Sequence, residues 1–153
     1  ILHKGMRLFP EAWEFGLWTT VRYIELGDYD GALETALQIA QIPGVPEIVQ
    51  RLPAFILERK GAYDLAISYL FVLLDQAKSE EEKDFISKRI LWVQRAEIIE
   101  RAAKQYHEKF GNYPPDPEEL VRAGFLDSIP EEPFGYQFGI SSKGKVYSWV
   151  PSK

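Results

Sequence analysis

The chain has 153 residues, of which 46% are hydrophobic and 27% charged, and this composition is typical of one soluble globular domain rather than a disordered or fibrous chain. Its net charge of −5 argues against a nucleic-acid partner, because phosphate binding needs a basic patch. The absence of cysteine excludes disulfides, thiol nucleophiles and cysteine-ligated metals, and no apolar stretch approaches the ~20 residues that a membrane-spanning helix needs.

Residues 10–43 are predicted to form a first helical hairpin. Apolar residues recur at helical spacing from Pro10 to Glu25, and Gly27 then provides a helix end with positive φ. Asp30 is predicted to cap the second helix, which continues until Pro43 stops it. The pattern therefore predicts two antiparallel helices joined by a short turn.

Residues 46–78 repeat this plan. Pro46 opens a helix that runs to Lys60, Gly61 turns the chain, and a second helix runs from a predicted Asp64 cap to Ala77. The two hairpins match at a 34-residue offset, which a chance similarity would rarely produce. The matched pairs are Gly27 with Gly61, Tyr29 with Tyr63, Asp30 with Asp64, Ala32 with Ala66 and Leu33 with Ile67.

The segments 26–33 and 60–67, together with Pro43, resemble the tetratricopeptide repeat family. Thr20 and Ala54, twelve residues before the matched alanines, also fit positions that this family keeps small. The resemblance implies a mainly α fold of antiparallel helical hairpins stacked as an α-solenoid. The chain departs from the family where Gly16 and Gln50 occupy the usual tryptophan position and where Pro53 falls inside a predicted helix.

A third helical segment is predicted over residues 79–110. Ser79 and Glu82 have the spacing of a capping box at its start. Arg95 and Glu97 stand where a further Gly-x-Tyr turn would fall, so the segment is either a hairpin or one bent helix. Residues 1–110 are accordingly predicted to form a domain of repeats at 10–43, 46–78 and 79–110.

Residues 111–153 are predicted to form a separate C-terminal cap, because proline and glycine become frequent there. Asp116 is predicted to cap a short helix over 118–123. Strands over 136–140 and 146–150 are predicted to pair across a turn at 142–144. Because an isolated hairpin is marginal in water, we expect a face with Phe138, Val146 and Trp149 to pack on the helices.

This C-terminal segment resembles type II secretion pseudopilins and type IV pilins. The resemblance is carried by Tyr106, residues 111–114, 119–120 and 129–136, Phe138 and residues 147–148. The chain differs in having Glu132 where the family has aspartate, in lacking the calcium loop, and in having no hydrophobic pilin helix before Ala96. We therefore expect a pilin-like cap rather than a filament subunit, with residues 133–135 anchoring a loop over the last helix.

The sequence predicts no catalytic site, cofactor or metal. His3 and His107 have no partner at metal-ligand spacing, and the runs of glutamate fall at helix starts or loops, where the helix dipole explains them. No phosphate-binding glycine loop, nucleophile elbow or HExxH motif is present. The expected function is therefore non-catalytic.

Stacked helical hairpins expose a concave face lined by their first helices. We predict that this groove binds a peptide or helix of a partner protein, with Arg51 or Arg89 pairing an acidic group. The alternative is that Phe55, Phe85 and Trp92 are core residues between repeats. The predicted groove residues are Leu17, Val21, Glu25, Arg51, Phe55, Arg59, Phe85, Arg89 and Trp92.

The sequence thus favours a protein-binding scaffold or adaptor, in a bacterial envelope, pilus or secretion assembly. Two alternatives are a structural C-terminal domain of a larger protein, which the start at Ile1 suggests, and an accessory domain of an enzyme. The expected partner is a protein or peptide, with no nucleic acid and no membrane span. A homo-oligomer and a cytoplasmic location both stay open, with the envelope favoured.

Overall fold

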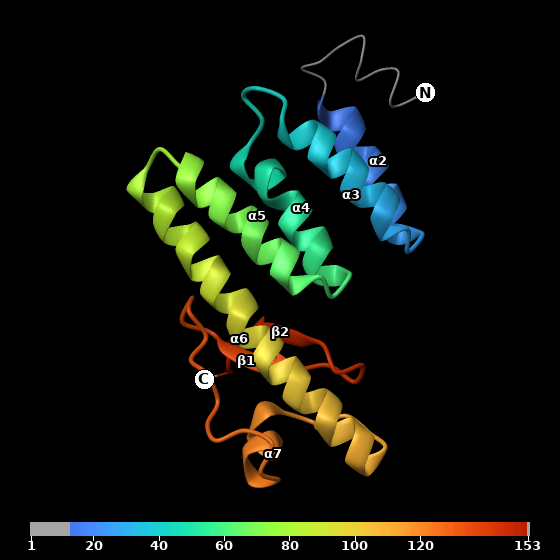
Figure 1. The fold of residues 1–153 in the computed structure, drawn as a ribbon, viewed down its shortest axis with the longest axis vertical. Helices are drawn as coiled ribbons and strands as arrows, with labels where there is room; N and C mark the ends of the chain where they lie inside the picture. The colour runs from blue at the N-terminus through green and yellow to red at the C-terminus, as the bar shows by residue number, and fades with distance from the viewer. Residues whose placement is uncertain (1–12, 153) are drawn as a thin grey trace. The chain divides into compact units, whose positions relative to one another are not determined.

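The computed structural model describes residues 13–152 as mainly helical, with one small sheet near the C-terminus (Figure 1). The chain divides into two compact units between Glu82 and Lys83. We call the part before this boundary the helical unit and the part after it the C-terminal unit. The mainly α fold with a small C-terminal hairpin, predicted from the sequence, is confirmed.

The helical unit contains consecutive helices that pack on one another in chain order. They are α2 (Trp13–Glu25), α3 (Tyr29–Ala40), α4 (Glu47–Arg59) and α5 (Tyr63–Gln76). α2 packs on α3, α3 on α4, and α4 on α5. Both helical hairpins predicted from the 34-residue pattern are therefore present, and Pro53 lies inside α4, as the sequence indicated.

The turns of the two hairpins have the same backbone geometry. Gly27 has φ 76° and donates to the Ile24 carbonyl at 3.0 Å, while the Asp28 amide donates to the Tyr23 carbonyl at 2.9 Å. This pair of bonds is a Schellman motif, which requires a residue with positive φ after the helix. The second turn repeats both bonds with Gly61 (φ 80°), Ala62, Glu58 and Leu57.

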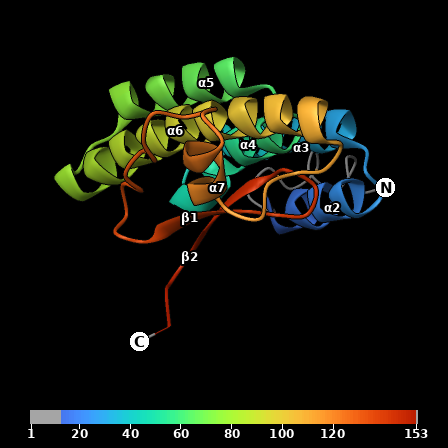
Figure 2. The same cartoon turned by 90° about the horizontal axis from the view of Figure 1, so that it is seen from below.

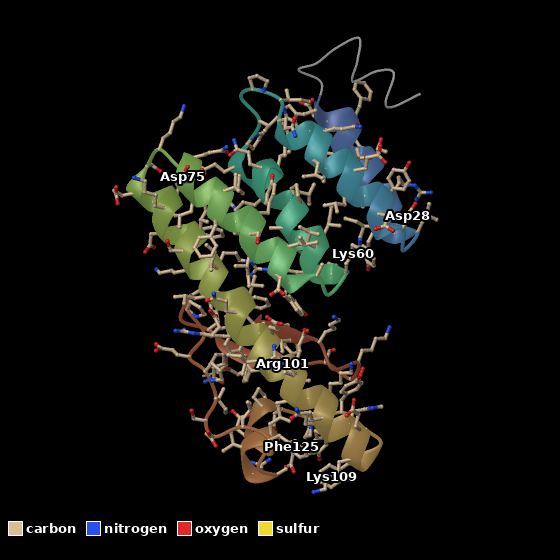
Figure 3. The ribbon with its side chains drawn as sticks, in the orientation of Figure 1. Asp28, Lys60, Asp75, Arg101, Lys109 and Phe125 are labelled. Atoms are coloured by element: carbon tan, nitrogen blue, oxygen red, sulfur yellow. The ribbon has the colours of Figure 1, made fainter. Side chains whose placement is uncertain are left out.

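The predicted caps of α3 and α5 are wrong by two residues, whereas Asp116 caps α7 as predicted. Asp28, not Asp30, caps α3, because its Oδ1 accepts the Gly31 amide at 2.9 Å (Figure 3). Ala62 precedes α5 and provides no side-chain cap. Asp30 and Asp64 lie in the first turn of their helices, where a negative charge complements the helix dipole. Asp30 also forms an ion pair with Lys60.

Small residues allow the helices of each hairpin to approach closely. Thr20 and Ala32 are fully buried in the first hairpin, and Ala54 and Ala66 are 2% and 0% exposed in the second. The Thr20 hydroxyl donates to the Gly16 carbonyl at 2.8 Å, so this buried polar group is satisfied. The positions that the repeat pattern predicts to be small are thus in the core.

α6 (Glu80–Phe110) is one continuous helix of 31 residues. Its start has one half of the predicted capping box, because the Ser79 hydroxyl accepts the Glu82 amide at 3.1 Å. The Glu82 carboxylate accepts the Lys78 amide, at 3.5 Å, rather than that of Ser79. A third hairpin over 79–110 is therefore not formed. The segment 94–97 contains good helix formers and neither glycine nor proline, so nothing local interrupts the helix.

The C-terminal unit combines most of α6 with α7 (Pro117–Arg122) and a hairpin of β1 (Gln137–Ile140) and β2 (Val146–Trp149) (Figure 2). In the antiparallel register, Phe138 pairs with Ser148 and Ile140 with Val146. Phe138, Ile140 and Val146 are buried, but Trp149 is 41% exposed. Trp149 was wrongly assigned to the inner face, because side chains alternate along a strand and positions 146 and 149 point to opposite faces.

The inner face of the hairpin packs on α6 through Trp92. The Trp92 ring lies 5.8 Å from the Phe138 ring, and its Nε1 donates to the Ser148 hydroxyl at 2.7 Å. Glu100 accepts the amide of Val146 at 3.0 Å, at the start of β2. These contacts supply the support that a two-stranded sheet needs in water.

Candidate functional site

The predicted groove residues are divided between the two units. Those on α2 and α4 belong to the helical unit, whereas Phe85, Arg89 and Trp92 are on the part of α6 in the C-terminal unit.

One face of α4 carries a row of apolar and basic side chains, which we call the α4 stripe: Ile48, Arg51, Phe55 and Arg59. All but the partly buried Arg51 are exposed. Ile48 is 71% exposed and Phe55 43% exposed. The Arg59 guanidinium lies over the Phe55 ring, 5.5 Å from its centroid. Arg51 pairs with Glu47 across one helical turn at 3.6 Å. The stripe thus combines accessible apolar surface with guanidinium groups.

Ile48 was missing from the predicted groove. The signal was present in the sequence, because position 48 lies one helical turn before Arg51 and two before Phe55, on the same side of α4. The equivalent position of the first hairpin, 34 residues earlier, is the charged Glu14. Comparison of the two hairpins therefore gave no indication of an apolar surface residue at position 48.

The α2 residues of the predicted groove differ from one another in burial. Val21 is 36% exposed, and Glu25 is exposed and paired with Arg22 at 2.7 Å. Leu17 is partly buried and packs against the cluster of Ile39, Val45 and Val49. Of the three α2 residues, Val21 and Glu25 are therefore available at the surface, while Leu17 mainly contributes to packing.

The α6 residues take part in contacts within the C-terminal unit. Trp92 is buried against Phe138, and the Arg89 guanidinium lies 4.3 Å from the centre of the Trp92 ring. The Phe85 ring lies 5.3 Å from the Phe134 ring, although Phe85 is still 38% exposed. Trp92 is therefore a core residue of this unit, packed on the C-terminal hairpin rather than between two repeats.

The helical unit also contains a pocket of about 620 Å³ that sequence reasoning did not identify. Tyr69 and Gln50 both line this pocket, and the Tyr69 hydroxyl donates to the Gln50 carbonyl at 2.8 Å. Burial raises the pKa of Tyr69 above its ordinary value. The pocket is lined by both apolar and polar side chains, including Leu37, Ile42, Glu47, Val72, Lys78 and Glu82.

Within residues 13–152, no three or more His, Asp or Glu side chains are grouped so that they could hold a metal ion. His107 stacks on Tyr113 with ring centroids 4.3 Å apart, and His3 lies outside the described residues. The exposed Arg122 has a raised pKa because its guanidinium donates a hydrogen bond to Glu119. In this same part of the chain, no helix has the length and apolar character needed to cross a membrane.

Comparison of the chain with protein-family models, with curated proteins and with solved structures finds no match. The resemblances to tetratricopeptide repeats and to pseudopilins therefore stay predictions. The exposed α4 stripe is the arrangement in the helical unit that best fits a binding role, because it presents an aromatic ring and guanidinium groups on a helix packed on both neighbouring helices.

Proposed function

We propose that the helical unit is a non-catalytic protein-binding module of tetratricopeptide-like hairpins, serving as a scaffold or adaptor. The observation that carries this proposal is the exposed Phe55 ring beneath Arg59, in a stripe that also contains Ile48 and Arg51. Aromatic and arginine side chains contribute most of the binding energy at many protein interfaces.

The chemistry of the α4 stripe indicates the kind of partner segment. Ile48 and Phe55 provide apolar surface, and Arg51 and Arg59 provide guanidinium groups that suit carboxylates. A peptide that places an apolar side chain on Phe55 and an acidic side chain beside Arg59 fits this surface. The proposed ligand is thus an apolar segment flanked by aspartate or glutamate.

The repeated turn geometry supports a repeat module as the framework of this site. Gly27 and Gly61 have nearly the same φ and the same Schellman bonds, and the small residues of both hairpins are buried. The setting in a bacterial envelope, pilus or secretion assembly is proposed only from the resemblance of the C-terminal segment to pseudopilins. A partner in such an assembly is accordingly part of the proposal.

Selection of a peptide library on the full chain tests this function. We expect enriched peptides to carry an apolar residue near Asp or Glu, and to lose about tenfold or more in affinity when Phe55 and Arg59 are both replaced by alanine. Leu65→Ala is the matched control, since Leu65 is 62% exposed on α5, outside the stripe. Equal binding to the wild type and to the Phe55→Ala/Arg59→Ala variant would contradict the proposal.

A further inference from the structure

The pocket of the helical unit lies where two helices end. Its wall includes Leu37 and Ala40 from the last turn of α3, and Leu73 and Gln76 from the last turn of α5. Neither of these turns contains a basic residue. Because the C-terminal end of a helix carries a partial negative charge, both helix ends favour a cation that their own last turns do not provide.

Two carboxylates on the pocket wall add to this negative charge. Glu47, in the first turn of α4, and Glu82, in the first turn of α6, both line the pocket. The Glu47 carboxylate lies 3.6 Å from Arg51, and its side chain is 56% exposed. Glu82 accepts the Lys78 amide at 3.5 Å. Since a carboxylate has about four acceptor positions, both groups can bind a further donor.

The charges of the pocket and of its surroundings are unbalanced toward the acidic side. Among the described residues that line the pocket, Lys78 has the one cationic side chain, against the two carboxylates. Residues 1–82 have 13 acidic and 7 basic side chains, whereas residues 83–153 have 10 and 11, so the net negative charge of the chain lies in the helical unit. This charge attracts a cationic ligand to the pocket.

The remaining wall of the pocket suits an aliphatic chain. Leu73 is buried, Leu37 is half-buried, and Val72 is 54% exposed. The Tyr69 hydroxyl already donates to the Gln50 carbonyl, so Tyr69 offers mainly the surface of its ring. A volume of about 620 Å³ is in the range of small-ligand sites. The pocket therefore combines apolar surface with acceptors for a positive charge.

We propose that this pocket binds a primary alkylammonium group, with the ammonium paired to Glu47 and Glu82 and the methylene chain against the apolar wall. An ammonium has three donors on a flexible stem, which suits carboxylates from two different helices better than a planar guanidinium does. Two sources share this chemistry, the side chain of a lysine in a peptide and a free polyamine. The site is distinct from the α4 stripe and does not depend on the proposed function.

An NMR titration of the isotopically labelled full chain tests this site. The probes are Nα-acetyl-lysine methylamide for a peptide lysine and cadaverine for a polyamine, and Nα-acetyl-norleucine methylamide is the uncharged control. Amine binding is expected to shift the amides of residues 41–44 and 76–78 saturably and to weaken as salt is added. The norleucine compound should bind about tenfold more weakly than the lysine compound. Binding of one amine and not the other supports the proposal and identifies the source.

Charge variants of opposite sign locate the ammonium. Glu47→Gln and Glu82→Gln are each expected to weaken amine binding about fivefold, because each removes a carboxylate and keeps the shape of the side chain. Lys78→Ala should strengthen it about threefold, because the Lys78 ammonium repels the ligand and competes for the same carboxylates. Glu81→Gln is the matched control for Glu82→Gln, since Glu81 is exposed in the same turn of α6 but does not line the pocket.

Three results would overturn the proposal. The first is equal binding of the lysine and norleucine compounds, and the second is the absence of saturable shifts with either amine. The third is a Glu81→Gln variant that weakens amine binding as much as Glu82→Gln, which would show attraction to the acidic unit as a whole and not to this pocket. Circular dichroism of each variant checks that its helices are retained.

Discussion

Glu132 organises the turn before the sheet with both of its carboxylate oxygens. Its Oε1 accepts the Phe134 amide at 2.5 Å and its Oε2 accepts the Tyr136 amide at 3.0 Å. Glu132 is 4% exposed, and Gly135 between the two amides has φ 87°. Glu132 is a departure from the pseudopilin pattern, which has aspartate at this position, and here the glutamate binds two backbone amides of the turn. The Glu132 carboxylate therefore accepts the Phe134 and Tyr136 amides in place of backbone carbonyls.

Replacing Glu132 with alanine is expected to destabilise the C-terminal unit by about 2–3 kcal/mol, because two amides lose a charged acceptor. Glu132→Gln should cost less, since its single amide oxygen can still accept one of the two bonds. Urea unfolding followed by tryptophan fluorescence measures both changes.

Glu131→Ala is the matched control for this prediction. Its side chain is exposed, and it is the Glu131 backbone carbonyl that accepts Arg95 at 2.6 Å, which the substitution retains. A surface change of this kind should stay within about 0.5 kcal/mol of the wild type. If Glu132→Ala were no more destabilising than Glu131→Ala, the role given to the buried carboxylate would be wrong.

At the scale of single elements, local signals in the sequence predicted the helices well. Glycine at the end of α2 and of α4, and proline at the start of α7, define helix ends through backbone geometry that few other residues allow. The caps of α3 and α5 were misplaced because Asp30 and Asp64 lie in the first turn of their helices, where the helix dipole also favours aspartate. Trp149 was assigned to the wrong face because the prediction relied on its hydrophobicity. The alternation of side chains along a strand places it on the face opposite to Val146.

The continuity of α6 is the element-level feature that the sequence left open. Gln94 is exposed in the middle of α6, so a substitution there tests the backbone without disturbing the core. Gln94→Pro is expected to cost about 3 kcal/mol or more, because proline removes one helical hydrogen bond and clashes with the preceding turn. Gln94→Gly should cost about 1 kcal/mol and Gln94→Ala almost nothing. Urea unfolding monitored by circular dichroism distinguishes the three variants, and a tolerated proline would instead indicate a turn at this position.

At the scale of the whole molecule, the sequence placed the groove residues on helix faces but could not separate surface from core. Leu17 is partly buried against Ile39, Val45 and Val49, and Trp92 is covered by Phe138 and Ser148. These partners come from other elements of the chain, so the periodicity of one helix does not reveal them. The predicted repeat domain over residues 1–110 stays a prediction, and the compact units of the structure divide between Glu82 and Lys83.

This division predicts that a small defect in one unit is felt mainly within that unit. Ile56 on α4 and Ile99 on α6 are both fully buried, one in each unit, so they form a matched pair. Ile→Val at either position should cost about 1 kcal/mol of stability, mainly through the methyl group that is removed. Hydrogen exchange under native conditions should then accelerate about fivefold in the unit that carries the substitution, and little in the other.

The matched pair makes the outcome of this measurement unambiguous. Ile56→Val is expected to accelerate exchange of the buried amides of α3, α4 and α5, and Ile99→Val those of β1, β2 and the second half of α6. Both variants lose the same methyl group from a buried helix position. If the two variants accelerate exchange at different sets of amides, the cause is therefore the boundary between the two units and not the chemistry of the substitution. Exchange that accelerates equally throughout the chain for both variants would show that the two compact units unfold as one cooperative structure.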